Sequence, residues 1–223
     1  MTCIDIYIDI ETVARPIEFA RDYLAEVEAK ARDELKLESA IQERIVRAKS
    51  KWGLALDGFE IACVGVAAQD LHLCFPTDVS IEAPTEKHTL EQLVAFLSQF
   101  EMNLHRLIGY NLKAFDLPRI AIALARHGLE WPLAVLPGSS YGSERVLDLM
   151  NDPNGKAMGI FGSTPSLDAY SRAYGLGVKQ FNAKKTTEMW LTVEGRQQLM
   201  AGCMWDIERT MLLHKKFQLM YHI

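Results

Sequence analysis

The segment Ile4–Thr12 is the part of this chain that most constrains how it folds. Its sequence, IDIYIDIET, has isoleucine at every even position from 4 to 10 and Asp, Tyr, Asp and Glu at the odd positions. Alternation with a period of two is typical of a β-strand, and β-branched isoleucines stiffen one. Because a strand places residues i and i+2 on the same face, we expect Asp9 and Glu11 to point the same way.

Two carboxylates so close together repel each other, and a divalent cation between them would offset that repulsion. The alternative is that Asp9 and Glu11 belong to the solvated polar face of a half-exposed strand. The pair by itself leaves both interpretations open, and the rest of the chain bears on the choice between them.

Composition and charge limit the functional classes. With 223 residues, 49% hydrophobic and 24% charged, the chain is typical of a soluble globular protein. No apolar run approaches the length of a membrane span, and the N-terminus leads directly into the first strand, so we expect a cytoplasmic protein without a membrane partner. The net charge of −5 argues against a broad basic surface for nonspecific nucleic-acid binding. It is compatible with an enzyme that holds nucleic acid through metal ions and a local basic rim.

The cysteines carry a separate prediction. Cys3, Cys63, Cys74 and Cys203 lie apart in apolar segments and form no Cys-x-x-Cys pair. This pattern predicts buried, reduced thiols, and it argues against a zinc knuckle and against a disulfide framework.

The remaining segments indicate an α/β domain. Residues 14–51 have no glycine or proline between Pro16 and Gly53 and carry apolar residues at helical spacing, which predicts two helices or one broken helix, inserted after the first strand. A hairpin is expected over 60–68 and 71–75, around the polar turn at 69–70. Further expected elements are helices over 91–100, 116–126, 164–174 and 193–220, a strand over 104–110, and loops around a short run at 145–150. Strands followed by alternating strands and helices predict a mixed sheet flanked by helices, in a single domain 1–223.

Two more acids lie at notable positions. Asp116 falls between an expected strand and an expected helix, where an N-cap is the simplest explanation. Asp206 lies on the final helix, on one stripe with residues expected to face the core: Leu199, Cys203, Thr210, Leu213 and Phe217. A buried carboxylate requires a cation, a proton or a strong donor, and Arg172 is one candidate structural partner.

These four carboxylates can converge on a common point. Four carboxylates around two divalent ions are the arrangement that phosphoryl transfer to water requires. Ligands that are all oxygen favour Mg²⁺ or Mn²⁺ over zinc.

At this level of detail the chain resembles the DEDD superfamily of 3′-5′ exonucleases, whose fold is ribonuclease-H-like. More narrowly, it resembles the predicted exonucleases related to the proofreading domain of family-B DNA polymerases. The corresponding motifs are Asp9-Ile10-Glu11-Thr12, Gly109-Tyr110-Asn111 with Phe115-Asp116-Leu117-Pro118, and Cys203-Met204-Trp205-Asp206 with Thr210. Further matching segments are 61–66, 147–150, 166–168 and 174–176, so the resemblance covers most of the chain outside 14–51.

The resemblance implies roles for individual residues. It implies that Asp9, Glu11, Asp116 and Asp206 hold two Mg²⁺ or Mn²⁺ ions. It also implies that Asn111 and Phe115 help to position the terminal nucleotide, and that the main chain near Thr12 lies against it. Without the family, Asn111 is equally well explained as a turn residue and Phe115 as a core residue.

One departure from the family concerns the group that activates water. These enzymes carry a tyrosine four residues before the last aspartate or a histidine five residues before it, and here those positions are Gly202 and Ala201. General acid–base help is worth about 10²–10⁴-fold in rate, so its loss would slow the metal-driven reaction without abolishing it. His214, Tyr170 and Tyr174 are conceivable substitutes, although core packing also explains the two tyrosines.

A basic and aromatic segment precedes the last helix. Lys179, Lys184 and Lys185, with Phe181 among them, predict a rim for single-stranded nucleic acid, in which Lys179 binds substrate. A solvated loop is the alternative.

Three functional hypotheses follow. The first is a metal-dependent 3′-5′ exonuclease acting on single-stranded DNA or DNA 3′ ends, with RNA as an alternative substrate. The second, motivated by Gly202 and Ala201, is a catalytically impaired relative that binds nucleic acid or a protein partner. The third, an interaction module built on the helices of 14–51, leaves Asp206 unexplained.

Overall fold

A computed structural model of the chain contains one five-stranded mixed sheet in its described part, which comprises residues 3–55, 57–80, 84–100, 105–133, 145–150, 165–179 and 185–221. The strands are β1 (Ile4–Ala14), β2 (Phe59–Ala68), β3 (Leu71–Phe75), β4 (His105–Gly109) and β5 (Val146–Asp148). Their order across the sheet is β3-β2-β1-β4-β5. β4 pairs in parallel with β1 and β5, whereas β2 and β3 are antiparallel.

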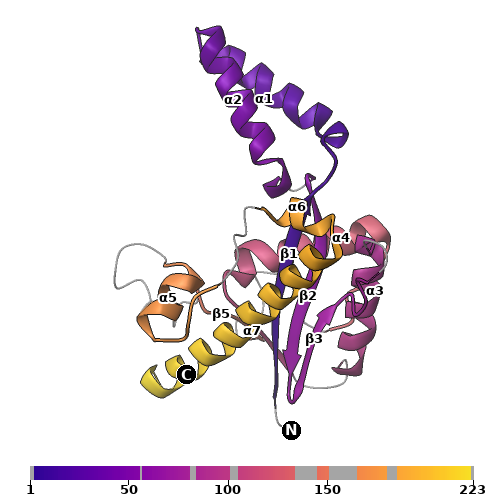
Figure 1. Cartoon of the computed structure of the whole chain (residues 1–223), viewed down its shortest axis with the longest axis vertical. Helices are drawn as coiled ribbons and strands as arrows, with labels where there is room; N and C mark the ends of the chain where they lie inside the picture. Colours follow the sequence, from indigo (N-terminus) through magenta and orange to yellow (C-terminus); the bar gives the residue numbers. More distant parts are fainter. Residues whose placement is uncertain are drawn as a thin grey trace. The chain divides into compact units, whose positions relative to one another are not determined.

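Helices lie between β1 and β2, between β3 and β4, between β4 and β5, and after β5 (Figure 1). They are α1 (Arg21–Glu34), α2 (Glu38–Ser50), α3 (Glu86–Leu97), α4 (Leu117–His127), α5 (Leu167–Ala173), α6 (Thr186–Trp190) and α7 (Val193–Tyr221). Short 3₁₀ segments lie at Ile17–Ala20, Trp52–Leu54 and Ser98–Phe100, and a π-helical segment, η4 (Leu112–Asp116), leads into α4. No helix in the described ranges combines the length and apolar character needed to cross a membrane.

The chain divides into two compact units, Met1–Glu11 with Ile61–Ile223, and Thr12–Glu60. In the second unit α1 and α2 pack against each other. Exposed ion pairs join them, including Arg44 with Glu34 at 2.5 Å and Arg32 with Glu38 at 3.0 Å. The helical insertion expected over 14–51 is therefore present as α1 and α2.

The expected α/β fold class, a mixed sheet flanked by helices in a ribonuclease-H-like arrangement, is confirmed. The predicted hairpin is also confirmed, with Gln69 and Asp70 as the two-residue turn between β2 and β3. The last helix runs from Val193 to Tyr221, close to the predicted bounds. Of the predicted helix over 164–174, the structure gives α5 at Leu167–Ala173, and residue 164 lies outside the described part of the chain.

Helix α3 begins five residues earlier than the sequence pattern predicts. The apolar periodicity starts near Leu90, but the side chain of Thr85 accepts a hydrogen bond from the backbone N–H of His88 and caps the helix there. The first turn is polar, so the hydrophobic pattern alone does not reveal it.

One face of the sheet carries the long helix α7 (Figure 1). Leu213 and Phe217 of α7 pack in a buried cluster with Ile108 of β4 and Tyr170 of α5, and the rings of Tyr170 and Phe217 meet edge to face at 6.0 Å. The other face of β1 carries Ile6, Ile8 and Ile10, all buried. The alternation that predicts the first strand therefore sorts its side chains into an isoleucine face and a face that meets α7.

Candidate functional site

Three carboxylates from β1 and α7 meet on the α7 face of the sheet. Asp9, Glu11 and Asp206 each offer an oxygen, and these oxygens all lie within 4.8 Å of one another. Asp9 and Glu11 lie two residues apart on β1, and Asp206 lies on the buried stripe of α7. That stripe is confirmed, since Leu199, Cys203, Thr210, Leu213 and Phe217 are all buried.

Asp116 is buried and anchored to the same strand. Its Oδ1 accepts a hydrogen bond of 3.1 Å from the backbone N–H of Ile10, the residue between Asp9 and Glu11. Asp116 stands at the N-cap position of α4, but its side chain makes no capping hydrogen bond there. Helix capping therefore does not account for this carboxylate.

The sheet topology explains why these acids are neighbours. β1, β4 and β5 run in parallel, with Tyr7 opposite Ile108 and Gly109 opposite Asp148. Their carboxyl ends consequently lie at one edge of the sheet, where ligands commonly bind in α/β folds. Asp9 and Glu11 follow Tyr7 on β1, Asp116 is the last residue of η4, which follows β4, and Asp148 ends β5.

The electrostatics of the acids reflect burial and mutual repulsion. Burial and the negative charges of Asp206, Asp116 and Glu11 raise the pKa of Asp9 well above its usual value. Burial likewise raises the pKa of Asp116. For Asp206, burial raises the pKa to about 6, although Lys179 acts in the opposite direction. The four acids therefore form an electrostatically strained group that a bound cation would relieve.

Lys179 provides one positive charge at this group. Its ammonium Nζ donates a 2.9 Å hydrogen bond to Glu11 Oε1 and another to Asp206 Oδ2. Burial alone would lower the pKa of Lys179, but the charges of Glu11 and Asp206 outweigh it and raise the pKa above the ordinary lysine value. Asp206 thus has Lys179 as its cationic partner, where the sequence had suggested Arg172.

Asp148 is a site residue whose role the sequence did not indicate. It is fully buried, and its two oxygens accept backbone hydrogen bonds from Asn111 at 2.9 Å, Lys113 at 2.9 Å and Met150 at 3.0 Å. It thereby holds the turn that delivers Asp116. The available signal was its position within the short run 145–150, beside the second motif in a parallel sheet.

The predicted substrate-binding residues differ in their surroundings. Asn111 has a left-handed backbone with φ of 64°, a conformation that asparagine tolerates, so it serves as a turn residue at the start of η4. Phe115 is half-buried beneath Arg119, whose guanidinium carbon lies 3.7 Å from the ring centroid. Thr12 is the first residue of the second unit. The nucleotide-binding roles of these residues and of Lys179 stay predictions.

The two positions at which the family carries its water-activating tyrosine or histidine, Gly202 and Ala201, both lie on α7. Gly202 is buried one helical turn before Asp206, whereas Ala201 is exposed. Among the conceivable substitutes, His214 is hydrogen-bonded to the hydroxyl of Tyr7, and Tyr170 and Tyr174 pack around Phe217. Of the predicted basic and aromatic rim, Lys179 and Lys185 are described, and the rest of the segment, 180–184, lies outside the described residues.

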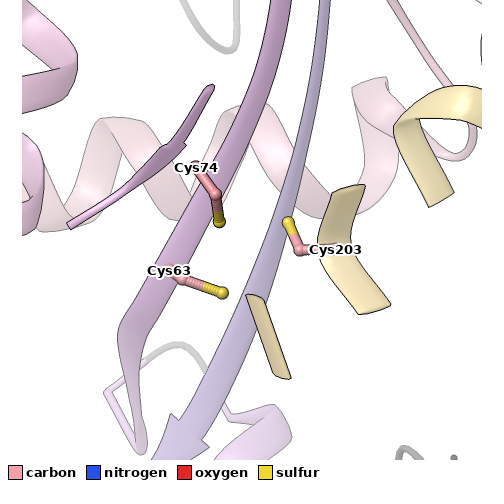
Figure 2. Close-up of side chains that lie close together, drawn as sticks. All are labelled: Cys63, Cys74 and Cys203. Carbon is pink, nitrogen blue, oxygen red and sulfur yellow. The ribbon is translucent and has the colours of Figure 1, made fainter. Parts of the chain in front are cut away.

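Three of the four cysteines converge, which the sequence analysis did not foresee. The sulfurs of Cys63, Cys74 and Cys203 lie within 4.8 Å of one another and point toward a common space (Figure 2). All four thiols are free, and Cys3 is exposed, so the prediction of burial is wrong for Cys3. Hydrogen bonds from Cys203 and Cys63 lower the pKa of the Cys74 thiol to about 5.

The predicted hairpin contained the signal for part of this cluster. A two-residue turn at 69–70 places Gly65 opposite Cys74, and Cys63 lies two residues from Gly65 on the same face of β2. The third member, Cys203, comes from α7, and its approach to β2 depends on tertiary packing.

Comparison with known proteins supports the fold. The chain is similar to the family B DNA polymerase from the hyperthermophilic archaeon Pyrobaculum calidifontis, with 18% sequence identity and a TM-score of 0.62. The similarity covers 97% of this chain and 25% of the polymerase chain, so this chain spans about a quarter of that protein's length. At this level of identity the similarity shows the fold alone. No family model and no curated protein matches the chain.

Proposed function

We propose that this protein is a metal-dependent 3′-5′ exonuclease that hydrolyses phosphodiester bonds at DNA 3′ ends. The observation that carries the proposal is the meeting of Asp9, Glu11 and Asp206, with oxygens within 4.8 Å of one another, beside the buried Asp116. The likeness of the fold to a DNA polymerase chain is consistent with a role on nucleic acid.

The donor set fits hard divalent cations. Carboxylate oxygens suit Mg²⁺ or Mn²⁺, and the repulsion among these acids would be relieved by two such ions. Bound there, the ions would lower the pKa of the attacking water and stabilise the leaving 3′ oxygen. Such ions would also hold Asp9 in its ionised form, against the burial and the charges of Asp206, Asp116 and Glu11 that raise its pKa.

The remaining residues of the chain would orient this chemistry. Asp148 fixes the turn at Asn111 and Lys113 through their backbone N–H groups. Phe115, held against Arg119, would offer an aromatic surface to the terminal base. The predicted contacts of Asn111 and of the main chain near Thr12 with the nucleotide remain part of this proposal. Lys179 would compete with a metal ion for Glu11 and Asp206, or turn toward the substrate phosphate once that ion is bound.

The test is a cleavage assay with an Asp9→Asn variant. Single-stranded, blunt and 3′-recessed DNA, each labelled at the 5′ end, is incubated with Mg²⁺ or Mn²⁺. We expect a ladder of shortened products from the wild type and at least roughly 100-fold slower cleavage by the variant, because a metal ligand is lost. The matched control is Asp70→Asn, the same substitution at an exposed turn residue. Absence of laddering with both metals, or laddering that survives in Asp9→Asn, would contradict the proposal.

A second candidate is a catalytically impaired relative that binds nucleic acid or a protein partner. The observation that favours it is the Lys179 ammonium, which already neutralises Glu11 and Asp206 in the way a resident cation would. The absence of tyrosine or histidine at Gly202 and Ala201 points in the same direction.

Cleavage by the wild type separates the two candidates, and a Lys179→Met variant measures how strongly the ammonium competes with a metal ion. If Lys179 replaces a metal ion, the wild type binds DNA without cleaving it, and Lys179→Met binds Mn²⁺ at least about 10-fold more tightly because an ammonium no longer competes. Mn²⁺ binding is measured by titration calorimetry, with the exposed Lys185→Met as the control. Robust Mg²⁺-dependent cleavage by the wild type would eliminate this candidate.

A further inference from the structure

We propose that Cys63, Cys74 and Cys203 form a binding site for one thiophilic metal ion, of the class of Zn²⁺ or Cu⁺. This three-cysteine site adjoins the carboxylates, since Cys203 Sγ donates to Asp9 Oδ2 at 3.4 Å, but its sulfurs are a separate set of ligands. It does not depend on the proposed nuclease activity.

The geometry of the sulfurs suits such an ion. All three lie within 4.8 Å of one another, and Figure 2 shows them pointing inward from β2, β3 and α7. Zinc–sulfur bonds of about 2.3 Å place neighbouring sulfurs roughly 3.8–4.0 Å apart in tetrahedral or trigonal sites, so only small movements are needed to bind. Thiolates select soft cations such as Cu⁺ and Zn²⁺, whereas the carboxylates select hard ones.

The backbone supports the site from the β2 side. Gly65 donates its N–H to Cys203 Sγ at 3.1 Å, a contact that orients the sulfur. A Cβ at position 65 would lie 2.9 Å from that sulfur, so glycine allows α7 to approach β2 this closely. Gly65 is also the cross-strand partner of Cys74, which brings all three cysteines to one point of the hairpin.

Burial and access also fit a metal site. Cys63 and Cys203 are completely buried, whereas Cys74 is partly exposed and marks the side from which an ion would enter. The three thiols come from three rigid elements and are not joined by a disulfide. Core packing explains why Cys63 and Cys203 are buried. It does not explain why three sulfurs face one another, one of them accepting the backbone N–H of Gly65.

The test titrates Cd²⁺ and Zn²⁺ into the reduced, metal-free full chain carrying Cys3→Ser, which removes the exposed thiol outside the site. We expect one Cd²⁺ per chain with a near-ultraviolet cadmium–thiolate absorption band, and protection of three thiols from a thiol reagent by Zn²⁺. Adding Cys74→Ala should weaken Cd²⁺ binding by at least roughly 100-fold, because one of three thiolates is lost. Excess Mg²⁺ should leave the band unchanged, because a hard cation competes for the carboxylates and not for the thiolates.

Two results would overturn the proposal. One is the absence of the thiolate band and of thiol protection in the Cys3→Ser protein, a measurement that requires no substitution in the core. The other is a band of unchanged affinity in a folded Cys74→Ala variant. Circular dichroism checks the fold of that variant, and the partial exposure of Cys74 makes the substitution mild.

Discussion

His214 illustrates how burial decides the chemistry of a single residue. Its side chain is 1% exposed, and a hydrogen bond of 2.8 Å joins its Nδ1 to the hydroxyl of Tyr7. Among the described residues, its Nε2 has no hydrogen-bond partner. Burial, reinforced by the charge of Arg106, lowers the pKa of His214 to about 4, although Asp5 acts in the opposite direction. His214 is therefore neutral at pH 7 and too weak a base to be well matched to activating water there.

This pKa predicts a pH dependence of stability. Between about pH 4 and 6.5, the unfolded chain protonates His214 and the folded chain does not, so the free energy of unfolding rises with pH across this window. The contribution is at most about 3 kcal/mol, since one pKa unit corresponds to about 1.4 kcal/mol. His214→Asn, whose amide can still bond to Tyr7, should have a flatter profile in urea unfolding at pH 4.5 to 7.5.

The control for this comparison is His72→Asn, because His72 is exposed on β3. Its profile should follow that of the wild type, because His72 is exposed whereas His214 is buried. If the free energy of unfolding rises with pH equally steeply in His214→Asn and in the wild type, the pH dependence of stability does not come from His214.

At the scale of elements, Glu86 joins two helices to the sheet. Its Oε1 accepts the backbone N–H of Ile61 on β2 at 2.7 Å. Its Oε2 accepts from Arg126 at 2.9 Å and His127 at 2.7 Å, both at the end of α4. With only 6% of Glu86 exposed, these contacts fix α3 and α4 against the start of β2.

Removing this charge should destabilise the fold. Glu86→Gln removes the negative charge that pairs with Arg126 and turns an amide N–H₂ toward donors, which should lower the free energy of unfolding by about 2–4 kcal/mol. Urea denaturation measures the loss. The control is Glu91→Gln on the same helix, whose 3.8 Å pair with Lys87 is exposed and should matter by less than about 1 kcal/mol. Similar losses for the two variants would contradict this role of Glu86.

The contacts of Glu86 also show where sequence patterns stop being informative. The period of two in β1 predicts that Asp9 and Glu11 share one face of the strand, and the stripe of α7 predicts Asp206 among core-facing residues, because these patterns depend only on local geometry. The partners of Glu86, Asp148 and Lys179 are long-range polar contacts, which depend on how whole elements pack. Lys179 was assigned to a basic rim for that reason, and the structure pairs it with Glu11 and Asp206.

At the scale of the whole molecule, the order of strands and helices predicts the fold class, but it does not predict the register in which the strands pair. Strands followed by alternating helices predict a mixed sheet flanked by helices, and family motifs predict which acids gather. That Gly109 pairs with Asp148, and that Cys203 reaches Gly65, depends on the parallel register and on a close helix–sheet contact. Neither leaves a periodic pattern in the sequence.

The division into two units predicts that the insertion is dispensable for the carboxylate site. Arg15 donates its backbone N–H to Gly58 O at 2.9 Å, so the chain leaves and re-enters at adjacent points. A type I′ Asn-Gly turn can therefore replace residues 16–57. Because Asp9, Glu11, Asp116 and Asp206 all lie in the other unit, the shortened protein should unfold cooperatively and bind Mn²⁺ within about 3-fold of the wild-type affinity.

Urea unfolding and Mn²⁺ titration of the shortened protein measure these two properties, and the DNA cleavage assay adds a third. Removal of α1 and α2 also removes Trp52, which is 2% exposed and donates its indole N–H to Arg15 O. Loss of this contact should lower the free energy of unfolding of the shortened protein. Trp52→Ala in the full chain measures the same loss with α1 and α2 still present. Retained cleavage with a changed preference among the three DNA substrates would assign the insertion to substrate choice, whereas loss of Mn²⁺ binding in a folded protein would mean that the insertion helps to form the site.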